Sequence, residues 1–140
     1  MQLVDAATTE RFFQSLQRCT SDPTFLQRFY ARFLLSSDEV AAKFARVDIP
    51  RQSRILRTSL YLMCRAAAGF EDGLSHLREI ATSHSRAKLD IGPHLYNIWL
   101  DCLVIVASET DPEFDDAVAQ SWRATLQPCI AVMTETSAAP

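Results

Sequence analysis

The stretch REIATSHSRAKLDIGPHLYNIW, residues 78–99, joins two helical patterns and places a histidine between them. Four positions at the spacing i, i+3, i+4 and i+7 share one face of the first helix: Leu77, Ile80, Ala81 and His84. His84 therefore points to the interior with the leucine and the isoleucine. Gly92-Pro93 then interrupts the chain and begins a strongly apolar helix. Two roles for His84 follow from this placement: a core histidine that donates to a backbone carbonyl, or a ligand.

Apolar residues recur at three- and four-residue intervals along the rest of the chain, which predicts helices throughout. Each predicted helix has a start or stop signal. The predicted helices run from Thr9 to Arg18; after Ser21-Asp22-Pro23, with Phe25 to Leu34; after Ser36-Ser37-Asp38, with Val40 and Phe44; from Ile49-Pro50 to Gly69; from Glu71 to about Arg86; from Gly92-Pro93 to about Ser108; and from Asp111-Pro112 to about Met133, with Pro128 expected to kink it. The sequence predicts an all-α fold of about seven helices in a single domain over residues 1–140, with frayed ends at 1–8 and 134–140.

Composition excludes several classes of protein. The chain has 140 residues, is 48% hydrophobic and has only 3 glycines, which argues against disorder, a loop-rich β-sandwich or a nucleotide-binding α/β fold. The formal net charge is −3, and no basic run exists to neutralise phosphates, so we expect no nucleic-acid partner. The separated arginines Arg46, Arg51, Arg54 and Arg57 are interpreted as solvated faces of helices.

The cysteines and the apolar runs predict the cellular compartment of the protein. Four cysteines are far apart in sequence and lie in apolar helical contexts, so we interpret them as reduced core thiols: Cys19, Cys64, Cys102 and Cys129. The N-terminal residues lack the pattern of a signal peptide, and the apolar runs are too short to span a membrane. We therefore predict a cytoplasmic protein with no membrane partner.

His84 on its own fits one kind of metal chemistry. Zinc needs three or four protein ligands, and the only other histidines are His76 and His94. A single histidine is sufficient for an axial bond to haem iron, because the porphyrin supplies four ligands. A tyrosine hydroxyl and a glutamine amide, such as those of Tyr30 and Gln52, are able to donate hydrogen bonds to a polarised gas ligand.

The order of six segments carries more information than any one of them. The segments are FYARF (29–33), VAAKF (40–44), PRQSRIL (50–56), IATSH (80–84), IGPHLYNIW (91–99) and SWRATL (121–126). Together they resemble the globin family, and most closely the globin domain of bacterial haemoglobins and flavohaemoglobins, from about Phe12 to Met133. The resemblance implies a globin fold, a three-over-three helical sandwich around haem b.

The resemblance also implies roles for individual residues. His84 matches the proximal iron ligand, and Tyr30 and Gln52 match the distal tyrosine and glutamine. Phe44 matches the phenylalanine that stacks on the porphyrin, and Leu56 matches the aliphatic residue above the iron. Tyr96 corresponds to the tyrosine that the family places beside the proximal imidazole. Three further residues are assigned near a haem propionate, His94 because it lies at a helix start and Arg86 and Lys88 because of their charge.

Two features depart from the flavohaemoglobin pattern. The segment between His84 and Tyr96 is about two residues longer, which leaves open whether the tyrosine lies beside the imidazole. The buried glutamate that the family carries late in its last helix has no match, because Glu135 is out of register. Without that glutamate the imidazole is less polarised, and peroxidase-like or dioxygenase chemistry is less favoured.

The sequence therefore predicts a single-domain bacterial-type globin that binds O2 reversibly, and also NO and CO, as a monomer or a homodimer. No catalytic residue is assigned. One alternative is an NO dioxygenase or an enzyme with pseudo-peroxidase activity. It would need a separate reductase, since 140 residues do not also accommodate a flavin domain. The others are a gas sensor that acts through a partner protein and an all-α domain without haem.

Overall fold

The computed structural model describes residues 1–85 and 89–138 of the chain. Within these residues the protein consists of helices and connecting turns, with no strand, so the prediction of an all-α fold is confirmed. The helices, in chain order, are α1 (Ala6–Thr20), α2 (Phe25–Leu35), α3 (Asp38–Lys43), α4 (Ile49–Ala67), α5 (Glu71–Ser83), α6 (Pro93–Thr110) and α7 (Asp116–Ala138).

Several of these helices are capped at their N-termini by a side chain. The carboxylate of Asp5 accepts a hydrogen bond from the Thr8 amide at 2.9 Å, and Asp48 accepts one from the Arg51 amide at 3.1 Å. Each cap satisfies one of the amides that lack a partner in the first turn of a helix. Because Asp5 caps it, α1 begins at Ala6 rather than at Thr9.

The last helix begins later than the sequence predicts. Asp111 does not start it, because its carboxylate is buried and accepts hydrogen bonds from the Ser15 hydroxyl at 2.7 Å and the Arg18 guanidinium at 2.6 Å. Asp115 instead accepts a hydrogen bond from the Val118 amide at 2.8 Å, and α7 starts at Asp116. The helix then continues through Pro128 as far as Ala138 rather than ending near Met133.

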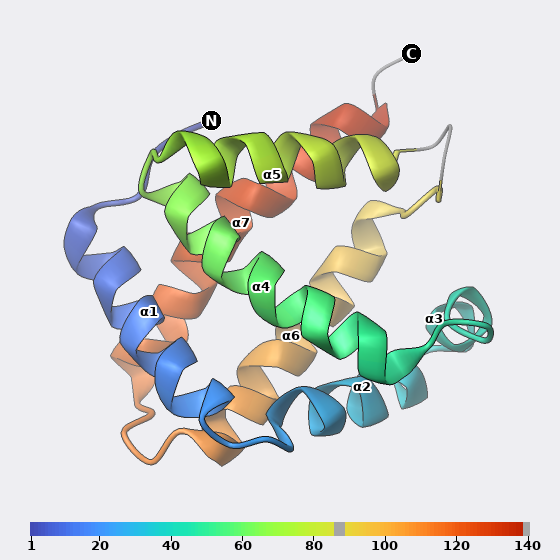
Figure 1. Ribbon diagram of the computed structural model, residues 1–140, viewed down its shortest axis with the longest axis horizontal. Helices are drawn as coiled ribbons and strands as arrows, with labels where there is room; N and C mark the ends of the chain where they lie inside the picture. Colours follow the sequence, from blue (N-terminus) through green and yellow to red (C-terminus); the bar gives the residue numbers. More distant parts are fainter. Residues whose placement is uncertain (86–88, 139–140) are drawn as a thin grey trace.

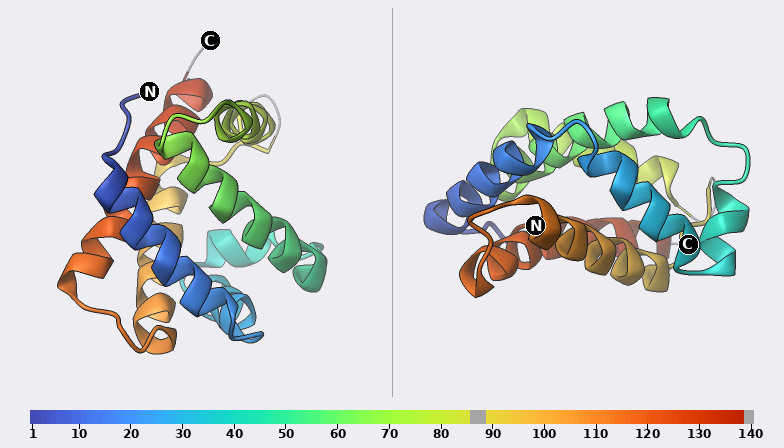
Figure 2. Two further views of the ribbon diagram at one scale, coloured as in Figure 1. Left: turned by 60° about the vertical axis from the view of Figure 1, so that its left-hand side comes forward. Right: turned by 90° about the horizontal axis from the view of Figure 1, so that it is seen from below.

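The helices pack in two layers across a shared core. In Figure 1, α4 crosses the face of the molecule, α5 lies along one edge above it, and α6 and α7 run behind. The right-hand view of Figure 2 shows α4 on one side and α6 and α7 on the other, with α2 passing between them. The largest buried side chain, that of Trp122 in α7, meets Phe12 of α1 edge to face, with ring centroids 4.8 Å apart.

Gly73 allows α5 to cross α4 at close range. A Cβ atom at this position would overlap the backbone of α4 at Leu62 and Ala66. The glycine is therefore required by packing and not by an unusual backbone angle. Its effect is to fix where α5, and the histidine that follows it, lies against α4.

All four cysteine thiols are buried, as predicted. Burial raises the pKa of Cys64 to about 11 and that of Cys129 to about 12, so both are protonated at neutral pH. None of the described helices combines the length and the apolar character needed to cross a lipid bilayer.

Candidate functional site

His84 lies at the C-terminal end of α5, directly after Ser83. Its amide donates to the Ile80 carbonyl at 2.9 Å and closes the helix, and its carbonyl accepts from the Ile91 amide at 3.1 Å. The backbone of His84 is thus held from both sides. Its side chain is half-buried, and burial lowers the pKa of the imidazole below its ordinary value. The ring is therefore mostly neutral at pH 7, which is the form that ligates a metal.

Tyr96 lies next to His84, although twelve residues separate them. Its hydroxyl is 3.2 Å from Nδ1 of His84, and the two rings are inclined by 25°. Tyr96 is buried in the first turn of α6, and burial raises its pKa to about 12, so the phenol stays protonated. When the imidazole proton is on Nδ1, that N–H donates to the phenol oxygen, and the lone pair of Nε2 is free to bind a ligand. The longer segment between the two residues does not separate them.

The predicted residues of α2, α3 and α4 form a second group. The rings of Tyr30 and Phe44 are 6.0 Å apart, and Phe44 also meets Phe33 edge to face at 5.6 Å. Burial raises the pKa of Tyr30 well above its ordinary value, and interaction with the Gln52 side chain partly offsets this effect. Leu56, one helical turn after Gln52, is buried. A protonated phenol, an amide, an aromatic ring and an aliphatic side chain are thus grouped in one region.

His94 is exposed, and its Nε2 atom is 2.9 Å from a carboxylate oxygen of Glu39 in α3. Lys43 of the same short helix donates to the backbone carbonyl of Asp90 at 3.0 Å. Two side chains of α3 therefore hold the chain at Asp90 and at His94. Glu39 and Lys43 were not predicted from the sequence, because Glu39 is 55 residues from His94 and Lys43 is 47 residues from Asp90, and no local pattern links such distant partners. Of the predicted propionate partners, Arg86 and Lys88 lie outside the described residues.

The donor set limits which metals this region is able to bind. Nowhere in residues 1–85 and 89–138 do three or more histidine, cysteine, aspartate or glutamate side chains form a group able to hold a metal ion. His84, with a neutral imidazole and one hydrogen-bonded nitrogen, offers a single nitrogen ligand. Such a set suits a metal whose other ligands come from a bound cofactor.

Two hollows of the surface lie away from the predicted residues. One, of about 430 Å³, lies between α2 and the first half of α4, and the other, of about 770 Å³, lies between α2 and α6. None of the seven predicted site residues in the described part of the chain lines either hollow.

Comparisons with known proteins agree with the all-α architecture of the chain. The Globin family model matches residues 27–133. The chain is 37% identical to a protein of known crystal structure from Pseudomonas aeruginosa PAO1, described as structurally highly homologous to a human hemoglobin. The match covers 94% of this chain and 99% of that one, with a TM-score of 0.90. No curated protein matches the chain. The prediction of a globin fold is confirmed.

Proposed function

The chain belongs to the globin family, and we propose that it is a haem b protein that binds O2 reversibly, with His84 as the protein ligand to the iron. Globins bind small gas ligands such as O2. The observation that carries the proposal is the hydrogen bond between Nδ1 of His84 and the Tyr96 hydroxyl. With the imidazole proton on Nδ1, this bond leaves the Nε2 lone pair free to bind a metal.

Haem would supply the iron at which a diatomic gas binds. The chain supplies a neutral imidazole at the end of α5 and, from α2 and α4, two hydrogen-bond donors. These are the Tyr30 hydroxyl, which burial keeps protonated, and the Gln52 amide. The partly buried Phe44 provides an aromatic surface, and the buried Leu56 an aliphatic one, for the porphyrin. The chemistry of these side chains fits a haem b cofactor.

His94 would contact a propionate only by exchanging its present partner, Glu39. A propionate carries the same charge as the Glu39 carboxylate, so the exchange replaces one anionic acceptor by another. We keep His94 among the proposed haem contacts for this reason.

Reversible binding is favoured over NO dioxygenase or peroxidase-like activity. Oxidative chemistry benefits from an imidazole with strong anionic character, which a buried carboxylate would provide. Tyr96 is a neutral phenol, and among the described residues its hydroxyl has a partner only in His84. Glu135 is exposed on α7. An NO dioxygenase with a separate reductase remains the second candidate, tested by catalytic turnover of NO to nitrate when a reductase is added.

The proposal is tested by visible absorption spectra of the purified protein in the ferric, dithionite-reduced and CO-bound states, before and after haemin is added. We expect a Soret band that shifts on CO binding, and its loss or a changed shape in His84→Ala. His76→Ala is the matched control, because His76 lies on the same helix and bonds Ser59 at 2.9 Å, away from Tyr96. A protein that stays colourless with haemin, or a spectrum that His84→Ala leaves unchanged, contradicts the proposal.

A further inference from the structure

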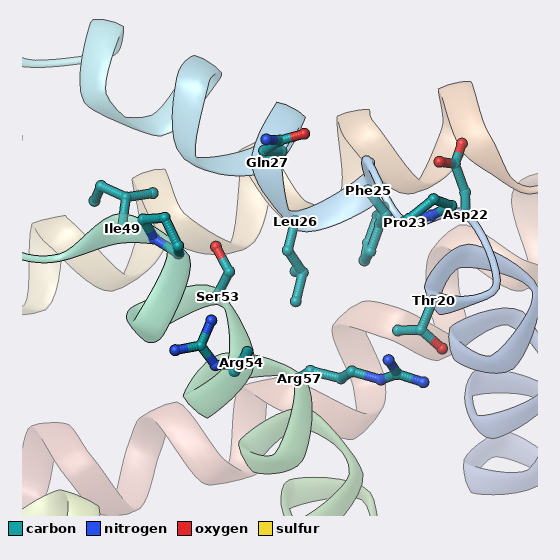
Figure 3. A pocket seen from close by; sticks show the side chains of 11 residues that line it. Thr20, Asp22, Pro23, Phe25, Leu26, Gln27, Ile49, Ser53, Arg54 and Arg57 are labelled. Atoms are coloured by element: carbon teal, nitrogen blue, oxygen red, sulfur yellow. The ribbon is translucent and has the colours of Figure 1, made fainter.

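The hollow of about 430 Å³ lies between α2 and the first half of α4. It is bounded by the corner between α1 and α2, by the start of α2 and by the first half of α4 (Figure 3). Gln52 and Leu56, which belong to the proposed haem site, do not line it, but Ser53 and Arg57, the next residue after each, do. This hollow is therefore separate from the site described above.

Much of the wall is apolar. The side chains of Phe25 and Leu26 are buried at its base, and Ile49 and Pro50 line the end nearest the start of α4. A purely ionic ligand, such as inorganic phosphate, would leave these surfaces without a partner. The wall instead suits a ligand with an aliphatic or aromatic body.

Two guanidinium groups border the hollow, and neither is neutralised within the described residues. Arg54 and Arg57 make no ion pair and no side-chain hydrogen bond there, and they line the hollow. Arg11, Arg46 and Arg51 are also without such partners, but none of them lines it. The other described arginines each pair with a carboxylate: Arg18, Arg28, Arg32, Arg65, Arg78 and Arg123. In Figure 3 the Arg57 side chain extends toward Thr20, and Arg54 lies on the same helix below Ser53. Both belong to a protein whose net charge is negative, so the excess of positive charge is local.

The one carboxylate in the wall already has partners. Asp22 accepts hydrogen bonds from the amide and the hydroxyl of Thr24, each at 2.8 Å, and pairs with Arg28 at 3.3 Å. It therefore does not neutralise Arg54 or Arg57. The hollow favours an anion over a cation.

A third polar group in the wall has no partner. The Ser53 hydroxyl oxygen is buried and makes no hydrogen bond to any described residue. A buried hydroxyl without a partner is uncommon and costs free energy. A ligand oxygen that entered the hollow would give this hydroxyl an acceptor.

We propose that this hollow binds a small organic carboxylate, with the carboxylate held by Arg54, Arg57 and the Ser53 hydroxyl and the hydrocarbon body against Leu26 and Ile49. Guanidinium groups bind carboxylates through paired, charge-assisted hydrogen bonds, which accounts for the charge of the ligand. The apolar wall accounts for its body. This inference does not depend on haem, since none of these residues belongs to the proposed haem site.

Octanoate is the probe, because it combines one carboxylate with an apolar chain, and octanamide is its neutral counterpart. Binding to the purified full-length protein is measured by isothermal titration calorimetry. Amide NMR shifts at Leu26, Ile49 and Ser53 report whether the hollow is the binding site. The test variant is Arg54→Gln/Arg57→Gln. The matched control is Arg51→Gln, which removes a charge from the same helix at a position that does not line the hollow.

We expect octanoate to bind with shifts at these three amides and more tightly than octanamide. The double variant should weaken octanoate binding by about tenfold or more, and Arg51→Gln should leave it nearly unchanged. The proposal is overturned if octanoate does not bind, if the shifts lie elsewhere, if octanamide binds equally well, or if the double variant keeps the affinity of the parent.

Discussion

The Tyr96 hydroxyl lies 3.2 Å from Nδ1 of His84, and it joins the start of α6 to the end of α5. The bond fixes the plane of the imidazole, because the ring cannot turn without losing it. It also selects the tautomer in which Nε2 is unprotonated when the phenol is the acceptor. The function proposed for His84 therefore depends on a residue in a different helix.

Tyr96→Phe should weaken haem binding without abolishing it. The substitution removes the hydrogen-bond partner of Nδ1 and keeps the ring, so the imidazole becomes a weaker and less well-oriented ligand. Loss of such a partner costs about 10- to 100-fold in metal affinity. The measurement is the rate of haem transfer to an apoprotein acceptor, together with the iron–histidine stretching frequency of the reduced protein, which should fall.

Tyr61→Phe is the matched control for this change. It also removes one phenol hydroxyl, which lies 2.8 Å from the Thr20 hydroxyl and has no contact with His84. Haem transfer and the stretching frequency should stay at the parent values. Equal effects of the two substitutions would show that Tyr96 acts only through stability.

Tyr30→Phe should accelerate O2 dissociation by about tenfold or more. The substitution removes a hydrogen bond to a polarised ligand, which is worth about 1.5–3 kcal/mol. Stopped-flow displacement of O2 by CO measures the rate, with Tyr61→Phe again as the control. A dissociation rate equal to that of the parent would remove Tyr30 from the distal site.

The pH dependence of O2 dissociation tests the same residue in the unmodified protein. Burial raises the pKa of Tyr30, so the neutral phenol persists to a higher pH than the ordinary value of about 10. The hydrogen bond should then be kept, and the dissociation rate should stay constant from about pH 7 to about pH 9.5. A rate that rises through this range as Tyr30 ionises would contradict a raised pKa.

Local patterns predicted most of the fold, because caps, prolines and apolar spacing act over a few residues. Ser37, Pro50 and Pro93 mark helix starts, as the structure confirms. The predicted start of α7 at Asp111 was wrong. The Asp111 carboxylate accepts hydrogen bonds from Ser15 and Arg18 of α1, and a local pattern does not record contacts between distant segments. At the site, the spacing of the apolar residues predicted which face of the helix carries His84. The pairing of His94 with Glu39 and the hollow beside Arg54 depend on contacts between distant segments, which a local pattern does not record. The arginines interpreted as solvated, Arg54 among them, are exposed.

Asp111→Asn should destabilise the fold by about 3 kcal/mol. The Asp111 carboxylate is fully buried, and it accepts hydrogen bonds from Ser15 and from Arg18, whose side chain is one-quarter exposed. Removing the negative charge leaves a largely buried guanidinium without its partner. Urea unfolding measures the change. Asp101→Asn is the control, because its pair with Arg123 is exposed, and it should cost less than about 1 kcal/mol.

The same carboxylate should make stability depend on pH. Burial alone would raise the pKa of Asp111, but hydrogen bonds from Arg18, Ser15 and the Glu113 amide outweigh it and lower the pKa. A carboxyl whose pKa is lower in the folded state contributes stability above its unfolded value of about 3.9, and loses it as the pH falls through the folded value. The difference in unfolding free energy between the parent and Asp111→Asn should therefore be constant near neutral pH and shrink below about pH 4. A difference that stays constant down to the acid transition would contradict the lowered pKa.

Gly73→Ala should destabilise the protein, although glycine-to-alanine changes inside helices ordinarily stabilise by about 0.5–1 kcal/mol. The new Cβ would overlap the α4 backbone at Leu62 and Ala66, and a backbone cannot move aside as the end of a side chain does. Forced overpacking of this kind costs about 1–3 kcal/mol. Gly92→Ala is the control, because its Cβ would meet only the exposed ring of His94. Urea unfolding should show a clear loss of stability for Gly73→Ala and little change for Gly92→Ala. A stabilised Gly73→Ala protein would mean that α5 does not cross α4 at this residue.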